Sequence, residues 1–548
     1  MLKGPARTLR TLAALRPRQL AMLVWRRGLQ PRLRRRPAVP DVPAFGEALT
    51  FRFLNRERSF APGVFNWQPA GEHRLWIYNL HYFGYLNDTA YPLAQQLALI
   101  EHWIAANPKG YGPGWEPYPT SLRLVNWLRW RDRNGGDEAA ASEPWASIDA
   151  SIREQADWLS RHLETHILAN HYFENLKALV FVAATLGGRA GRFRQARLEM
   201  KLLRELGEQF LDDGGHYERT PSYHCLLLDG LLDLIELDQR RPGVLSGVLS
   251  QALHATATAA LDALRAMELP GDAYPLFNDS AFDSAPRPSA LYARALDLGL
   301  GWEIPEQPAQ IALEDFGVFG WRSERAGVMA IKCGAVGPRY QPGHTHCDLL
   351  SFEWYLGGRP IVVDTGVLEY EPGPLRRYVR STAAHNTVAI AGEEQSEVWG
   401  EFRVARRAAV LAGGVASTAE GVEFLGEIEG FHAAGSALHH QRRLGYRDAG
   451  AGVTIYVEDL ITGRGDYDLS SRLLFHPSIT LEHDTAGTWH VFRHKRFIAT
   501  LETRGVDCEL VDAPYCPEFG LALPARQLVM RTRCALPTRL SYTFKLAH

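Results

Sequence analysis

Two histidines, His344 and His346, stand two positions apart in the segment Gly343-His344-Thr345-His346-Cys347-Asp348. In a β-strand, residues i and i+2 lie on one face, so a strand here would turn both imidazoles toward one cavity. Asp364 and His385 follow downstream. Two imidazoles and one carboxylate, completed by a water, can form a tetrahedral zinc site. A histidine pair that faces solvent or is hydrogen-bonded in the core is the alternative.

A second polar cluster opens a segment that is otherwise apolar, in the run Asn170-His171-Tyr172-Phe173-Glu174-Asn175. On a helix, His171, Glu174 and Asn175 share a face because they stand at positions i, i+3 and i+4. A Glu174 that accepts from the imidazole would fix its tautomer and raise its basicity. An N-cap role for Asn170 is the purely structural alternative.

A glycine-rich turn leads into a later helix through Asp213-Gly214-Gly215-His216-Tyr217-Glu218-Arg219-Thr220-Pro221-Ser222-Tyr223-His224. Tyr223 falls in the first turn of that helix, where its ring could also simply pack and its hydroxyl be hydrogen-bonded. Two further polar segments are candidates for substrate contact: Trp115 to Ser121, which leads into Arg123, and the loop from Pro275 to Ser280.

Helical periodicity positions the clusters around Asn170 and Tyr223. Between residues 86 and 300, apolar residues recur every three or four positions, and Gly, Pro or Asp punctuates the gaps. Short loops between consecutive helices predict a bundle, an α-solenoid or a ring of hairpins. The predicted helices are Ala90–Asn107, Ser121–Arg133, Ala146–His162, Asn170–Leu186, Ala196–Asp212, Ser222–Asp238 and Val248–Met267.

The period changes after about residue 310 to short segments rich in β-branched and aromatic residues, which predict strands. No helix alternates with them, so we expect a two-layered antiparallel sheet. The predicted strands are Val328–Cys333, Ile361–Asp364, Thr387–Ala391, Val453–Val457, Leu469–Phe475, His490–Phe497 and Leu540–Phe544. The predicted fold class is therefore multidomain α+β, with a basic arm at 1–60, a helical domain at 61–305 and an antiparallel β-sandwich at 306–548.

The ordered set of motifs resembles the heparinase II/III-type polysaccharide lyases, whose relatives include alginate lyases and uronyl C5-epimerases. The motifs are Asn170-His171 with Glu174-Asn175, Gly214-Gly215 with Glu218 and Pro221-Ser222-Tyr223-His224, His344-x-His346 with Asp348, Val363-Asp364-x-Gly366, and Arg380-Ser381-Thr382 with His385-Asn386-Thr387. The resemblance covers about residues 60–480. It implies an (α/α) toroid followed by antiparallel sheets.

The resemblance also implies roles for individual residues. Asn170 and His171 would face a uronate carboxylate, and Tyr223 and His344 would act as acid and base, in an order that the sequence leaves open. The implied metal ligands are His346, Asp364 and His385, with zinc in a structural role. Substrate-binding candidates are Trp115, Tyr118, Arg123, Glu174, Glu218 and Arg380. Thr345 and Cys347 depart from the small residues that relatives often have there.

The function predicted from these groups is β-elimination on a uronic-acid polysaccharide. A C5-epimerase would use the same carbanion, so it remains an alternative, as do a non-catalytic polysaccharide-binding or assembly protein and a metallohydrolase. The predicted partner is an acidic polysaccharide, with no nucleic acid. The oligomeric state stays open.

Charge is distributed unevenly along a chain whose formal net charge is −2. Residues 1–40 hold eleven bases and no acid, together with leucines at near-helical spacing. Such an arm can contact anionic lipid, in a peripheral membrane association, or can pack across the protein. Six cysteines form no CxxC motif and no disulfide framework, and we find no secretory signal. The predicted location is cytoplasmic, near a surface-polysaccharide assembly pathway.

Overall fold

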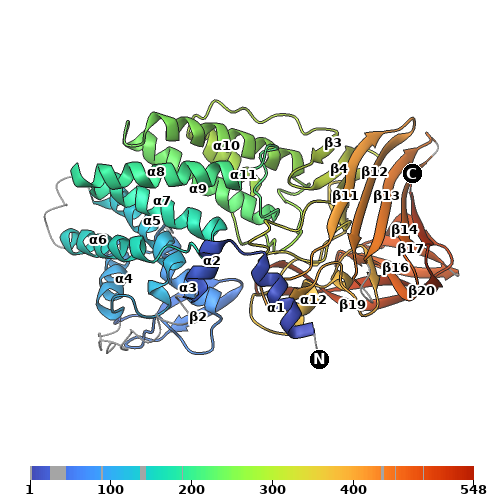
Figure 1. The fold of residues 1–548 in the computed structure, drawn as a ribbon, viewed down its shortest axis with the longest axis horizontal. Coiled ribbons are helices and arrows are strands. Elements are labelled where there is room, and N and C mark those ends of the chain that lie inside the picture. The colour runs from blue at the N-terminus through green and yellow to red at the C-terminus, as the bar shows by residue number, and fades with distance from the viewer. Residues whose placement is uncertain are drawn as a thin grey trace. The chain divides into compact units, whose positions relative to one another are not determined.

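The computed structural model describes residues 3–24, 45–87, 91–135, 144–187, 189–432, 437–450, 452–485 and 487–547 (Figure 1). These residues form two compact units whose segments alternate along the chain. Unit 1 comprises Met1–Ala14, Gln209–Asp229 and Thr256–His548, and unit 2 comprises Leu15–Glu208 and Gly230–Ala255. Residues 25–44 of the predicted basic arm lie outside the described residues.

Unit 2 is mainly helical, as the periodicity predicts. In it, α5 packs against α3, α6 and α7. Helix α7 is buried along most of its length, and its buried polar side chains Glu174 and Lys177 pair with one another. Two helices, α9 and α10, run from one unit into the other. The helices of this part are α2 (Pro17–Val24), α3 (Arg74–Tyr82), α4 (Leu93–Ala106), α5 (Pro117–Asn134), α6 (Trp145–Arg161), α7 (Ala169–Leu186), α8 (Arg189–Gln209), α9 (Pro221–Arg240) and α10 (Gly247–Met267), and a hairpin of β1 (Leu49–Phe53) and β2 (Arg56–Phe60) precedes α3.

Unit 1 contains two large antiparallel sheets. In its described residues, one sheet has the strand order β11-β12-β13-β14-β21-β18-β17-β16. The strands β11 to β14 are neighbours in chain order, as are β16 to β18, and β21 lies between the two groups. Its strands are β11 (Ala409–Ser417), β12 (Gly421–Gly430), β13 (Leu438–Asp448), β14 (Val453–Thr462), β16 (Ile479–Thr485), β17 (Thr488–Arg493), β18 (Arg496–Thr503) and β21 (Thr538–Leu546).

The second sheet has the order β19-β20-β15-β7-β6-β5-β4-β3, and β8 pairs with β15 beside that path. Its strands are β3 (Gln310–Leu313), β4 (Val318–Ser323), β5 (Gly327–Lys332), β6 (Phe352–Leu356), β7 (Arg359–Val362), β8 (Val388–Ile390), β15 (Asp466–Phe475), β19 (Asp507–Glu518) and β20 (Leu521–Ala535). Unit 1 also includes α1 (Lys3–Ala13), α11 (Pro288–Asp297), α12 (Pro374–Val379), β9 (Val398–Trp399) and β10 (Arg403–Val404).

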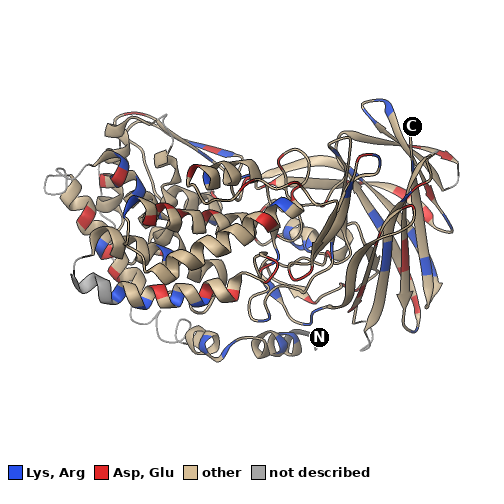
Figure 2. Cartoon of the chain, turned by 90° about the horizontal axis from the view of Figure 1, so that it is seen from above, with Lys and Arg blue, Asp and Glu red and all other residues tan. Residues whose placement is uncertain are grey.

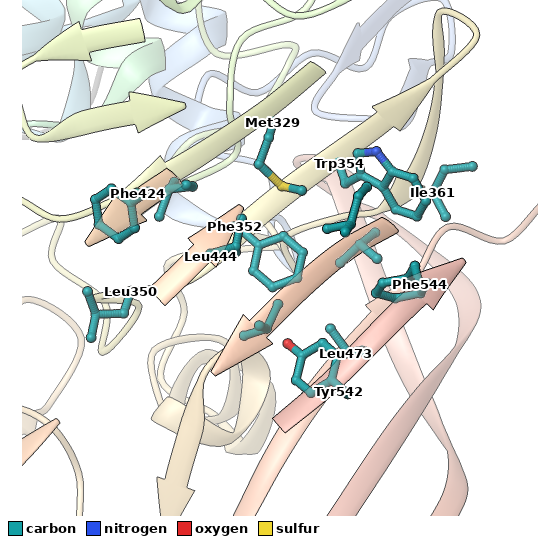
Figure 3. Close-up of a cluster of buried hydrophobic side chains, with 14 of the residues drawn as sticks. Met329, Leu350, Phe352, Trp354, Ile361, Phe424, Leu444, Leu473, Tyr542 and Phe544 are labelled. Atoms are coloured by element: carbon teal, nitrogen blue, oxygen red, sulfur yellow. The ribbon is translucent and has the colours of Figure 1, made fainter. Parts of the chain in front are cut away.

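The two sheets share one apolar core (Figure 3). Ring centroids lie 5.1 Å apart for Trp354 of β6 and Phe544 of β21, and 5.6 Å apart for Phe319 of β4 and Phe424 of β12. Each pair joins a strand of one sheet to a strand of the other, so burial of these rings helps to hold the two sheets together. The predicted antiparallel two-layer arrangement is confirmed.

One predicted strand is wrong in detail. The segment His490–Phe497 is a hairpin, in which β17 ends at Arg493 and β18 begins at Arg496. His494 and Lys495 form its turn with positive φ angles of 46° and 67°. Neither is Gly or Asn, so the sequence carries no turn signal there. All six cysteines are free.

Candidate active site

The carboxylate of Asp279 binds both histidines of the His-x-His motif. Asp279 lies in the loop between α10 and α11, and its Oδ2 is 3.0 Å from Nδ1 of His344. Its Oδ1 is 2.7 Å from Nε2 of His346. A ring nitrogen that donates to a carboxylate carries the proton. The lone pair is therefore on Nε2 in His344 and on Nδ1 in His346.

Arg376 of α12 holds the same carboxylate from the other side. Its Nη2 donates to Asp279 Oδ2 at 2.8 Å, and its Nη1 donates to Oδ1, so the pair is bidentate. Burial alone would raise the pKa of Asp279, but Arg376 and the two imidazoles outweigh it and hold this pKa well below its ordinary value. Asp279 is therefore ionised at neutral pH and can orient both rings.

The two histidines do not reach Asp279 from a strand, so that premise of the prediction is wrong. His344 and His346 lie in the loop that joins β5 to β6. They converge because they bind opposite oxygens of one carboxylate, not because they alternate along a strand.

Tyr223 and Tyr370 meet beside His344. Their hydroxyl oxygens are 3.0 Å apart, and the centroids of the Tyr223 and His344 rings are 4.0 Å apart. The Arg376 guanidinium lies 5.0 Å from the centroid of the Tyr370 ring. Nε2 of His344 is 3.6 Å from Oε2 of Glu218. The structure thus brings together the predicted residues Tyr223, His344 and Glu218 within unit 1.

Both hydroxyls are phenols at neutral pH. Burial is the main cause that raises the pKa of Tyr223 well above its ordinary value, and Tyr370 beside it raises it further. Burial likewise raises the pKa of Tyr370, and the charge of Asp279 adds to the effect. Each phenol therefore carries, at neutral pH, the proton that a general acid has to donate.

Asn170 and His171 lie in unit 2, on the first turn of α7. The N-cap is Leu168, so the N-cap role of Asn170 is wrong. The carboxylate partner of His171 is Glu164, whose Oε1 is 3.1 Å from Nδ1, and the expected pairing with Glu174 is wrong. Burial opposes ionisation of Glu164, but His171 and Asn175 prevail and lower its pKa.

Four predicted substrate-binding residues are used inside the protein. The fully buried guanidinium of Arg123 donates to Gln155 and lies 3.8 Å from the Trp103 ring, so it cannot contact a substrate directly. Glu174 is 2.9 Å from the ammonium of Lys177.

Trp115 and Arg380 are also buried, because the Trp115 indole donates to Asn107 and the Arg380 guanidinium donates to the carbonyls of Thr345 and Gly400. Direct substrate contact by these two side chains is therefore wrong. Tyr118, in contrast, has its ring centroid 4.4 Å from that of His171, and Glu218 lies near His344.

Known families match both parts of the chain. Residues 140–297 match the heparinase II/III N-terminus, and residues 305–543 match the heparinase II/III-like C-terminal domain. The chain belongs to the heparinase II/III-type polysaccharide lyase family.

Solved structures share the fold. Heparinase III superposes with a TM-score of 0.67 at 16% identity, over 88% of this chain and 79% of that chain. A mutant of the heparan sulfate lyase HepC from Pedobacter heparinus superposes with a TM-score of 0.61 at 17% identity, also over 88% of this chain and 79% of that chain. No curated protein matches the sequence. The likeness confirms a heparinase III-like fold, with a helical part followed by antiparallel sheets.

The zinc that the heparinase II/III-type resemblance implies has matching donors in unit 1. His385 Nδ1 lies 2.9 Å from Asp364 Oδ2, and the rings of His346 and His385 are 5.4 Å apart between centroids. Nδ1 of His346 and Nε2 of His385 are buried and have no hydrogen-bond partner among the described residues. Two orphaned imidazole nitrogens beside a carboxylate fit zinc chemically.

These donors are not gathered into a ready coordination shell. In the described part of the chain, no three His, Cys, Asp or Glu side chains are close enough together to hold a metal. A buried cation is already present nearby, because the ammonium of Lys332 is 2.5 Å from Asp348 Oδ1 and also donates to Asn278. Zinc therefore stays a proposal.

Reasoning from sequence missed four residues that belong to these sites. Asp279 lies in the polar run Asn278-Asp279-Ser280, which follows an apolar pair of residues. This pattern marks the loop as a candidate for substrate contact but predicts no role for Asp279 itself. Tyr370 and Arg376 follow Asp364 in a segment without a periodic pattern. Glu164 precedes His171 by seven positions and lies in the loop before α7, so no helical or strand spacing relates the two residues.

Proposed function

We propose that this heparinase II/III-type protein cleaves a uronic-acid polysaccharide by β-elimination. The observation that carries the proposal is the cluster of Tyr223, Tyr370, His344 and Asp279, in which a phenol pair, an imidazole and its carboxylate lie in contact. These are the groups needed to move two protons, one from carbon to the protein and one from the protein to a leaving oxygen.

The C5 proton of a uronate becomes acidic only when the adjacent carboxylate is neutralised, since the charge then spreads into an enolate-like species. Asn170 and His171 are the proposed neutralising donors. The ionised Glu164 beside Nδ1 supports a His171 that carries its proton there. Each well-placed donor of this kind is worth on the order of 10²–10³ in rate. The proposal requires these unit 2 residues to reach the same sugar as Tyr223.

His344 is the proposed base. Nδ1 of His344 donates its proton to Asp279 in a hydrogen bond, so Nε2 carries the lone pair. The ionised carboxylate of Asp279 stabilises the imidazolium that forms when Nε2 takes a proton. As Nε2 takes the C5 proton, the electron pair of the C5–H bond forms the C4=C5 double bond. The C4–O bond then breaks, and its electron pair leaves with the oxygen.

Tyr223 is the proposed acid that protonates the departing C4 oxygen. Its high pKa keeps it a phenol at neutral pH, and Tyr370 at 3.0 Å can donate a hydrogen bond to the phenolate that forms. The products are a new reducing end and a 4,5-unsaturated sugar, without water or a redox cofactor as reactant. A zinc ion held by His346, Asp364 and His385 would rigidify the loops around His344.

The proposed setting is a cytoplasmic step in the assembly of a surface polysaccharide. The cysteines, all free, suit a reducing compartment. The substrate is an acidic polysaccharide.

The deciding experiment incubates the purified chain with a panel of uronic-acid polymers in deuterated water. Growth of the ultraviolet absorbance of a C4=C5 double bond, with new chain ends, supports the lyase. Deuterium at C5 without that absorbance means a C5-epimerase, which shares the carbanion but returns a proton instead of expelling the C4 oxygen. If no polymer gives the absorbance or takes up deuterium at C5, but the chain still binds a polymer, only the non-catalytic role remains.

Matched variants separate chemistry from binding. His344→Gln and Tyr223→Phe should each slow the growth of the absorbance on the order of 10²–10⁴-fold. Polymer affinity should stay within a few-fold, because neither change removes a carboxylate-binding group. Chelation distinguishes the metallohydrolase alternative, in which turnover disappears while the fold survives.

A further inference from the structure

An exposed aromatic side chain, Phe402, stands beside the proposed base. It lies in the turn between β9 and β10 and is 43% exposed. The centroid of its ring is 5.2 Å from that of Tyr370 and 6.2 Å from that of His344, all within unit 1. Single exposed apolar residues are common on protein surfaces, so the neighbours of Phe402 and the way its turn is held decide whether the ring has a function.

Two buried arginines fix the backbone of this turn. Arg376 donates to the carbonyl of Glu401 from Nε at 3.2 Å and from Nη2 at 2.7 Å. Nη1 of Arg380 donates to the carbonyl of Gly400 at 2.8 Å. Both arginines are 1% exposed, so a shift of the turn would leave buried donors without acceptors. The interior of unit 1 therefore sets the position of Phe402.

Arg376 couples the Phe402 turn to the proposed base. The Nη2 that donates to Glu401 also donates to Asp279 Oδ2 at 2.8 Å, and the same Oδ2 accepts from Nδ1 of His344 at 3.0 Å. The Arg376 guanidinium lies 5.4 Å from the centroid of the Phe402 ring. One buried side chain therefore holds both the imidazole and the aromatic ring, and such shared support fixes a binding group relative to a reacting group.

The ring contacts of Phe402 are edge-to-face. Its plane meets that of Tyr370 at 68° and that of His344 at 78°, so neither neighbour lies flat on the Phe402 ring. The face of an aromatic ring is electron-rich and attracts the C–H groups that a pyranose presents on its less polar side. An exposed phenylalanine held in this way is suited to stack on a sugar.

We propose that Phe402 is a substrate-binding residue that stacks on the pyranose ring next to the uronate from which His344 takes its proton. This inference rests on the proposed function of His344. Stacking recognises the C–H face of a sugar and not its charge, so Phe402 accepts a neutral or an acidic pyranose. A docking surface for another protein would not require one guanidinium to hold both the ring and the carboxylate partner of the base.

The test measures affinity and turnover of the full chain with heparan sulfate, polymannuronate and polygalacturonate. Affinity is measured in the His344→Gln background, in which the polymer is cut too slowly to be consumed, and KM and kcat are measured with His344 intact. Phe402→Ala should weaken affinity about tenfold and raise KM by a similar factor. The change in kcat should be smaller, because Phe402 holds a sugar and moves no proton.

Two further substitutions separate stacking from simple apolar contact. Phe402→Leu keeps an apolar side chain but has no aromatic face, so it should lose as much affinity as Phe402→Ala. Phe402→Trp has a larger aromatic face and should bind at least as tightly as the parent. Thermal unfolding of these variants should stay close to that of the parent, because much of the exchanged side chain is exposed.

The matched control is Phe497→Ala. Phe497 is 39% exposed and lies in β18, which pairs with β21 in the eight-stranded sheet. Figure 2 shows Lys and Arg interspersed with Asp and Glu on the strands near the C label, and Lys545 of β21 pairs there with Glu502 of β18. An anionic polymer is not attracted to such mixed charge, so this variant should bind and turn over like the parent.

The outcomes distinguish this inference from the proposed function. Unchanged affinity and KM in Phe402→Ala, or full affinity in Phe402→Leu, would overturn stacking, while a parent that cleaves its polymer still supports the lyase. If the parent binds a polymer without cleaving it, and Phe402→Ala weakens that binding, the stacking role stands and the lyase fails. A parent that binds none of the three polymers would overturn the stacking role.

Discussion

The hydroxyl oxygens of Tyr223 and Tyr370 lie 3.0 Å apart, although 147 positions separate the residues in the chain. Tyr223 opens helix α9, whereas Tyr370 follows strand β7. The pair is buried, and burial keeps both phenols protonated at neutral pH.

Removing the Tyr223 hydroxyl should lower turnover on the order of 10²–10⁴-fold, because the leaving oxygen loses its acid. Tyr370→Phe should cost less, since Tyr370 only supports the phenolate. Turnover is followed by ultraviolet absorbance. Tyr467→Phe is the control, because that hydroxyl donates to the Arg464 carbonyl, outside the cluster. Equal turnover of Tyr223→Phe and the parent would exclude the acid role.

Asp279 should matter for both stability and turnover. Asp279→Asn leaves the buried Arg376 without a counter-charge, so the free energy of unfolding should fall by about 3–5 kcal/mol. Turnover of the folded fraction should also fall, because an amide no longer favours the imidazolium of His344. Urea unfolding and absorbance measure the two effects. Asp272→Asn, at a half-buried carboxylate that binds Ser289 and has no buried cation beside it among the described contacts, should change stability far less than Asp279→Asn.

Zinc content can be measured on the purified protein. If His346, Asp364 and His385 hold the ion, we expect about one zinc per chain, and a chelator should lower Tm and activity together. His385→Ala should contain no zinc. His440→Gln is the matched control: His440 is equally buried, and its Nε2 is 2.7 Å from Asp459, but Arg442 supplies the cation there. That variant should lose stability and keep its zinc. Retention of zinc by His385→Ala would exclude the predicted site.

Acid should destabilise the sandwich through Asp459. Burial would raise the pKa of Asp459, but Arg442 and His440 prevail and lower it far below its unfolded value. A lowered carboxyl pKa stabilises the fold above about pH 4, and this contribution disappears as the pH falls toward the folded pKa. The free energy of unfolding should therefore decrease below pH 4, by at most about 1.4 kcal/mol per pH unit from this group.

Asp459→Asn should remove that part of the slope and lower stability at neutral pH, because Arg442 is left unpaired. Asp512→Asn is the control, since its side chain is 89% exposed and pairs with the partly exposed Arg526. Denaturant unfolding at a series of pH values measures both. Parallel pH profiles for the parent and Asp459→Asn would contradict the assignment.

The sequence by itself determined the fold class and its order, because periodicity is a local property. Helices such as α7 and strands such as β15 follow from spacing and residue type within a single segment. The sequence also determined the motifs that contain Tyr223 and His344, because each motif is a run of neighbouring residues. The predicted convergence of Asn170 and His171 with Tyr223 stays a prediction.

Only the tertiary structure decided which side chains bind one another across long separations. Asp279 joins His344, His346 and Arg376, which the chain separates by 65, 67 and 97 positions, and no local pattern encodes such a meeting. The same holds for Glu164, which replaced Glu174 as the partner of His171. Tertiary packing also decided that Arg123 is a core residue, since burial depends on the neighbours that surround a side chain and not on its type alone.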